Sequence, residues 1–164
     1  MQYPETDFLA ILSSLAERQV EFIVVGGVSA VLQGAPIATF DLDVVHSLSS
    51  ENVRKLLVTL EALNASCRTP GSRNVKPEPS HLSSSRHQLL MTRFGPLDLL
   101  GSIGRDRRYN DLLADSLAME IGSGLQVQVL DLSTVIETKE ETAHEKDTAV
   151  LAILRRTLEE KKRR

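Results

Sequence analysis

FIVVGGVSA at Phe22–Ala30 and FDLDVV at Phe40–Val45 are the two stretches that decide the fold. The first has the composition of a buried strand that runs into a glycine pair and then a short helix. The second is typical of another strand and carries carboxylates at Asp41 and Asp43. Because strand side chains alternate between faces, we expect both carboxylates on one face and the apolar residues beside them in the core.

These carboxylates and glycines together predict a kind of site. Two like charges on an apolar strand are costly unless a cation lies between them. Mg²⁺ is often held by one or two carboxylates plus substrate phosphates. Gly26 and Gly27 allow close backbone approach, and a helix N-terminus offers unpaired N–H groups. The stretch therefore predicts a site for nucleotide phosphate and metal.

Length, composition and charge narrow the class of protein. A chain of 164 residues is long enough to bury a core as one domain. Apolar residues at 41% and charged residues at 25% are ordinary for a soluble globular protein. The net charge of −3 argues against extended non-specific DNA binding. A single cysteine, Cys67, excludes an internal disulfide, and with no signal-like or long apolar segment we expect a cytoplasmic protein without membrane spans.

Apolar spacing and turn residues predict the remaining elements. Helices are expected over residues 6–18, 26–33, 49–64 and 109–113, with two more from about residue 133 onward. Strands are expected over residues 21–25, 39–45, 87–92, 96–100, 117–121 and 125–130. Thr6 is the expected cap of the first helix, and Thr142 with Glu145 forms the expected capping box of a C-terminal helix and tail over 142–164. This order indicates a mixed sheet flanked by helices in a single α/β (α+β) domain over residues 1–164.

Residues 65–86 lack any apolar period and are expected to form a long basic loop. They contain one acid, Glu78, and four basic residues, Arg68, Arg73, Lys76 and Arg86. A structureless segment of this length is either a mobile solvated loop or one that contacts a substrate, and both interpretations stay open.

Two further features accompany the Asp-x-Asp pair. A third carboxylate, Asp98, lies within GPLDLL at Gly95–Leu100, flanked by apolar residues as on a core strand. Lys139 and Lys146 offer positive charge for a triphosphate, although such lysines also occur on solvated helix faces. An Asp-x-Asp pair alone is found in several enzyme classes, so only its combination with the glycine pair, the third carboxylate and the lysines indicates one class.

In this order the motifs resemble the DNA polymerase β-like nucleotidyltransferase superfamily. The similarity is greatest to the minimal nucleotidyltransferase branch that includes toxin enzymes of the AbiEii and MenT type. It covers about residues 20 to 155. The matching residues are Val25–Ala30, Gly34–Pro36, Thr39–Asp43, Gly95–Leu100, Lys139 and Lys146–Asp147.

The resemblance implies a nucleotidyltransferase fold and two-metal chemistry. An NTP would donate a nucleoside monophosphate to an RNA 3′ end or a protein hydroxyl, with two Mg²⁺ ions as cofactors. A role as a toxin–antitoxin type enzyme would bring an antitoxin partner, and no membrane is implied. The implied metal-binding and catalytic residues are Asp41, Asp43 and Asp98, and the implied phosphate-binding residues are Gly26, Gly27, Ser29 and Lys139.

Two positions depart from the pattern. Ile37 and His144 stand where the family commonly has arginine, which binds phosphate through a charged fork. Basic residues of the 65–86 segment are candidates to replace the lost guanidinium groups. The alternative function is a catalytically silent nucleotide-binding or partner-binding module of the same fold. A haloacid-dehalogenase-like phosphatase fits less well, because it requires its Asp-x-Asp on the first strand.

Overall fold

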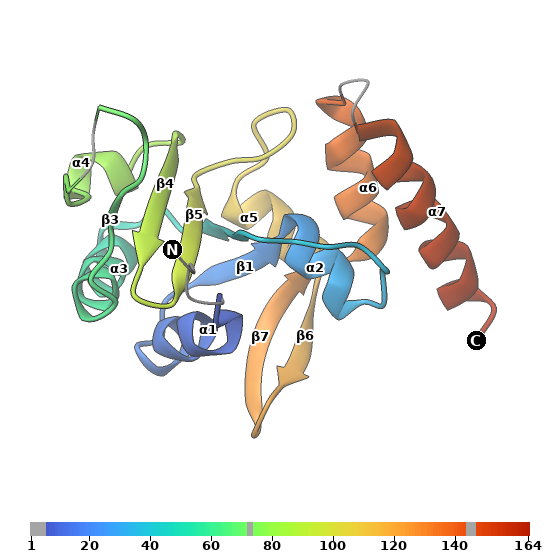
Figure 1. Cartoon of the computed structure of the whole chain (residues 1–164), viewed down its shortest axis with the longest axis horizontal. Coiled ribbons are helices and arrows are strands. Elements are labelled where there is room, and N and C mark those ends of the chain that lie inside the picture. Colours follow the sequence, from blue (N-terminus) through green and yellow to red (C-terminus); the bar gives the residue numbers. More distant parts are fainter. Residues whose placement is uncertain (1–5, 72–73, 144–146) are drawn as a thin grey trace, which may run out of the picture.

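A computed structural model describes residues 6–71, 74–143 and 147–164. These residues form a seven-stranded mixed sheet with the order β3-β4-β5-β2-β1-β7-β6 (Figure 1). The strands are β1 (Phe22–Val25), β2 (Leu42–His46), β3 (Ser66–Cys67), β4 (His87–Thr92), β5 (Gly95–Leu100), β6 (Ser116–Ile121) and β7 (Leu125–Leu130). The parallel pairs are β1 with β7 and β2 with β5, and the other neighbours are antiparallel. The predicted mixed α/β fold is confirmed.

Apart from α4 (Pro79–Leu82), which lies in the segment expected to be a loop, the helices lie close to the positions expected from sequence. They are α1 (Phe8–Glu17), α2 (Gly26–Leu32), α3 (Ser50–Ala62), α4 (Pro79–Leu82), α5 (Tyr109–Leu112), α6 (Leu132–Glu141) and α7 (Thr148–Lys162), with a 3-10 turn at Leu113–Asp115. None of them, in the part of the chain that the structure describes, is long and apolar enough to cross a membrane.

Two predicted helix caps are wrong. Asp7, rather than Thr6, caps α1, because its carboxylate accepts a hydrogen bond from the Ala10 N–H at 3.0 Å. Thr142 does not begin a helix but ends α6, where its N–H donates to the Lys139 carbonyl at 3.3 Å. The partner expected in the capping box, Glu145, lies outside the described residues.

The sheet separates two apolar cores. Along β1, Val24 belongs to the core formed with α1 and α3, whereas Ile23 and Val25 belong to the core formed with α2, α6 and α7. This is the strict alternation that a strand buried on both faces requires. Along β2, Val44 joins the first core and Val45 the second. Asp43 therefore faces the same side as α2, α6 and α7.

The segment over residues 65–86 is more ordered than predicted. β3 pairs with β4, with Ser66 opposite Met91, and the Cys67 N–H donates to the Val75 carbonyl at 2.8 Å. The short helix α4 follows. A two-residue strand is too short to leave a period in the sequence, so it was not predicted. Arg73 lies outside the described residues.

Candidate active site

The parallel register of β2 and β5 brings two carboxylates together. Asp43 lies directly opposite Asp98, within a run of pairs that begins with Leu42 opposite Leu97. Asp41 lies at a bend directly before β2, and its carboxylate is close enough to that of Asp43 to contribute to the raised pKa of Asp43. Asp98 is only 8% exposed. The three carboxylates that the sequence singled out thus gather at one place on the α2–α6–α7 side of the sheet.

Burial and neighbouring charges raise the pKa of Asp43 to about 7. The largest cause is burial, followed by the charge of Asp98, a hydrogen bond with it and the charge of Asp41, while Arg68 acts in the opposite direction. Burial disfavours the charged form of Asp43, and the two neighbouring carboxylates add to the effect. A cation beside the carboxylates would offset both causes.

Arg68 supplies the cation nearest to these carboxylates. Its Nη1 donates to the Asp98 carboxylate and, at 2.9 Å, to the Leu90 carbonyl, while Nη2 lies 3.7 Å from Asp41 Oδ2. Burial disfavours the charged form of Arg68, but the hydrogen bond and charges of the carboxylates outweigh it and raise its pKa. The sequence offered Arg68 as one of several interchangeable loop cations, and only the structure distinguishes it.

The glycine pair is required by close packing against β2 and the chain that precedes it. Gly26 has φ +64°, and a Cβ there would lie 2.6 Å from Asp43 Oδ2. A Cβ at Gly27 would lie 2.8 Å from the Thr39 hydroxyl oxygen. Side chains at either position would displace Asp43 or Thr39, so the pair keeps the first turn of α2 against the carboxylates.

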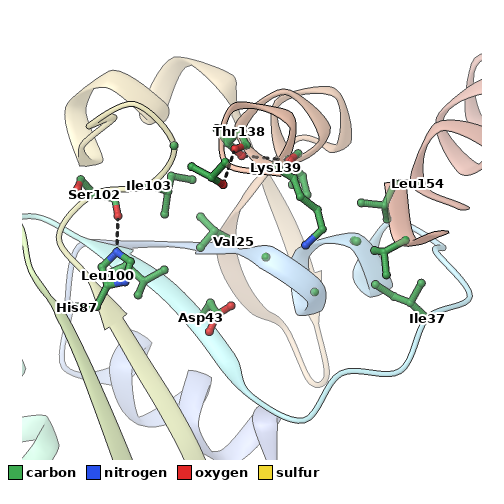
Figure 2. Close-up of a pocket in the computed structure, with 17 residues that line it drawn as sticks. Val25, Ile37, Asp43, His87, Leu100, Ser102, Ile103, Thr138, Lys139 and Leu154 are labelled. Atoms are coloured by element: carbon green, nitrogen blue, oxygen red, sulfur yellow. Dashed lines mark hydrogen bonds between the residues drawn. The ribbon is translucent and has the colours of Figure 1, made fainter. Parts of the chain in front are cut away.

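A cleft of about 380 Å³ opens between the sheet and the α6–α7 pair (Figure 2). Gly26, Gly27 and Asp43 line one part of it, and Lys139 reaches into it from α6. Lys139 Nζ also lies 3.4 Å from Asp147 Oδ1. Much of the remaining wall is apolar, including Val25, Ile37, Leu100, Val135 and Leu154. Charged groups at one part and apolar walls elsewhere suit a ligand with a phosphate end and a flat apolar end.

Ser29 lies away from this cleft. It is fully buried, and its hydroxyl donates to the Leu130 carbonyl at 2.7 Å. Gln33 Nε2 donates to the same carbonyl at 2.8 Å. Ser29 therefore fastens α2 to the end of β7, and its hydroxyl is not directed at the predicted phosphate position. Of the two positions that depart from the family pattern, Ile37 lines the cleft, while His144, like Lys146, lies outside the described residues.

The donor chemistry of the cluster fits Mg²⁺, since carboxylate oxygens are its usual protein ligands. Asp43 and Asp98 are adjacent in register, and burial together with the charges of Asp98 and Asp41 raises the pKa of Asp43. Within the described ranges, however, no group of three His, Cys, Asp or Glu side chains is arranged to hold a metal ion as it stands. Arg68 is bound to two of the three carboxylates instead.

Comparisons with known proteins support the fold. TM1012 from Thermotoga maritima, a candidate nucleotidyltransferase, superposes with a TM-score of 0.58 at 19% identity, over 93% of this chain and 90% of that chain. ANT(2″)-Ia in complex with adenylyl-2″-tobramycin gives a TM-score of 0.54 at 15% identity, over 90% of this chain and 85% of that chain. A solution structure of the same antibiotic-resistance factor gives 0.54 at 15% identity, over 90% and 80%.

No protein-family model and no curated protein matches the sequence. At these identities the structural likeness establishes the fold alone. The predicted nucleotidyltransferase fold is therefore confirmed, and the toxin branch stays a prediction.

Proposed function

We propose that this chain is a Mg²⁺-dependent nucleotidyltransferase that moves a nucleoside monophosphate from an NTP to a hydroxyl on RNA or protein. The observation that supports it most strongly is the parallel register that sets Asp43 opposite Asp98, beside the glycine pair and a cleft of about 380 Å³. Solved structures with the same fold include a candidate nucleotidyltransferase and a protein bound to an adenylylated antibiotic.

Asp41, Asp43 and Asp98 would hold the Mg²⁺ ions. When bound, Mg²⁺ stabilises the charge that develops on phosphoryl oxygens and favours deprotonation of the attacking hydroxyl. The hydroxyl oxygen forms a bond to the α-phosphorus, the bond from that phosphorus to the bridging oxygen breaks, and pyrophosphate leaves. The hydroxyl proton passes to water.

The chain's own residues position the nucleotide. Lys139 would neutralise phosphate charge from α6, and the backbone of Gly26 and Gly27 leaves room for phosphate beside Asp43. The apolar walls of the cleft would exclude water from around the base and ribose. We leave Ser29 out of the phosphate site because its hydroxyl bonds Leu130.

We expect the acceptor molecule to contact the enzyme over only a short part of its length. The whole chain carries a net charge of −3 and only 4% aromatic residues, a composition that disfavours holding a long single strand, which requires stacking platforms along a basic groove. An RNA 3′ end or a protein hydroxyl meets this requirement. The role as a toxin with an antitoxin partner rests on the resemblance of the motifs.

Labelled NTPs incubated with cell extract and Mg²⁺ test the proposal. We expect the wild-type chain to label one RNA or protein species and Asp98→Ala to label none, and RNase and protease digestion then assigns the acceptor. Ile37 occupies a cleft position where the family commonly has arginine, which favours the silent module as the second candidate. Binding of all four NTPs with labelling by none would establish that alternative.

A further inference from the structure

Arg68 reaches the carboxylates from the β3 edge of the sheet rather than from the cleft. Its Nη1 contacts Asp98 and the Leu90 carbonyl, and its Nη2 lies within ion-pair distance of Asp41. Lys139, the cation on the cleft side, is paired with Asp147. Arg68 thus holds two of the three side chains that the proposed reaction needs for metal.

The side chain of Arg68 can leave without disturbing the backbone that carries it. Its N–H donates to the Leu89 carbonyl at 3.1 Å, and the preceding Cys67 is paired with Leu90. These bonds fix the backbone independently of the guanidinium. The side chain is 24% exposed, so rotation about its own bonds can carry the charge into solvent.

We infer that Arg68 is the resident counter-ion of the carboxylate cluster and that a divalent cation binds there by displacing it. This inference rests on the proposed function, because it concerns the same carboxylates. Both cations use the oxygens of Asp98 and Asp41, and like charges held a few ångströms apart in a partly buried site repel one another. Arg68 therefore sets the affinity for metal as a positioning residue and contacts no reacting atom.

The exchange also gives the 65–86 segment a role. Asp41, Asp43 and Asp98 would repel one another without a cation, and Arg68 keeps them together while metal is absent. Arg86, in the same segment, is exposed and makes no ion pair within the described residues. It serves as a control of equal charge.

Mn²⁺ binding to the full chain without nucleotide, followed by electron paramagnetic resonance, tests the exchange. Arg68→Met keeps the aliphatic stem and removes the charge that competes with the metal. Because that charge is partly buried, we expect its loss to lower the Kd for Mn²⁺ about tenfold. Arg68→Lys should lie between it and the wild type, because an ammonium lacks the paired donors. Arg86→Met should leave the Kd unchanged. Without metal Arg68→Met should melt lower than wild type, and saturating Mn²⁺ should raise its Tm more.

Damage to the fold alone would weaken Mn²⁺ binding, so a gain in affinity identifies the exchange. A folded Arg68→Met chain that binds Mn²⁺ no more tightly than wild type overturns the inference. Should Arg68→Met not fold, Arg68→Lys takes its place, and an unchanged or higher Kd there has the same meaning. Failure of the proposed function is recognised separately, as the absence of any shift in wild-type Tm with NTP and Mg²⁺.

Discussion

Strand β2 carries one titratable side chain with a shifted pKa on each face of the sheet, the partly buried Asp43 and the buried His46, and the two have different surroundings. Burial is the largest cause of both pKa shifts, raising that of Asp43 to about 7 and lowering that of His46. His46 is fully buried, and its Nε2–H donates to the Leu82 carbonyl at 2.8 Å. Asp43 faces a cleft, two further carboxylates and a guanidinium.

The difference shows that burial of a titratable group does not by itself indicate chemistry. His46 is enclosed by the core that includes residues of α3 and α4, and its one hydrogen bond goes to a backbone carbonyl. The cost of burying Asp43 is increased by like charges, and this is tolerated beside an open cleft. The predictions below test whether the two faces differ in function as they do in structure.

The largest effect is expected on the cleft face. Asp98→Ala should reduce nucleotidyl transfer at least about 100-fold, since even outer-shell residues of metal sites cost 10- to 100-fold. Glu120→Gln on β6, an exposed acid away from the cluster, is the control and should keep wild-type activity. Transfer of labelled nucleotide measures the activity of both variants. Comparable activity in the two would show that Asp98 is not needed for catalysis.

Lys139 should contribute to nucleotide binding. Lys139→Met is expected to weaken NTP·Mg²⁺ binding about tenfold, the value of a charge-assisted hydrogen bond to phosphate. Lys55→Met on α3, which removes a surface ion pair with Glu51, should leave it unchanged. Thermal shifts measure the difference, because ligand at about 100 times its Kd adds roughly 2.7 kcal/mol of stability. Equal thermal shifts in both variants would mean that Lys139 does not bind nucleotide and only occupies a solvated helix face.

Asp43→Asn should stabilise the metal-free chain. The folded pKa is about 7, above the ordinary aspartate value of 3.8, so the cost of ionising Asp43 grows as pH rises toward 7 and is complete above it. The variant should therefore gain about 1 kcal/mol or more over wild type at pH 8 and much less at pH 5. Denaturant unfolding at the two pH values measures this. A loss of stability at pH 8 would mean that the carboxylate supports the fold.

His46 should affect stability at acid pH and leave transfer unchanged. Its folded pKa is lowered, so the stability of the neutral form is complete above about pH 6.5 and declines below it. Protonation would charge Nδ1, which has no hydrogen-bond partner within the described residues. His46→Gln should flatten the stability profile between pH 7 and 5 by up to about 1 kcal/mol. Transfer lost in His46→Gln at pH 7 would break the contrast between the faces.

The sequence alone determined most elements of the fold, though not β3 or α4, and the kinds of residue in the site. Alternation around Val24 and Val44, the glycines that break β1 and the apolar residues around Asp98 are signals between near neighbours in the chain. Such signals can be read from the sequence because side chains along a strand alternate between the two faces of the sheet, so burial repeats every two residues. They also named the three carboxylates and the glycine pair that the structure brings together.

Tertiary structure decided which of these residues meet. The register of β2 with β5 aligns Asp43 with Asp98, and a two-residue strand selects Arg68 as the cation beside them. Likewise, the packing of α2 against β7 turned Ser29 into the core. Each outcome depends on contacts between segments 30 to 101 residues apart, as between Arg68 and Asp98 or Ser29 and Leu130. A local pattern carries no information about such pairing, because register is fixed by what packs across the sheet.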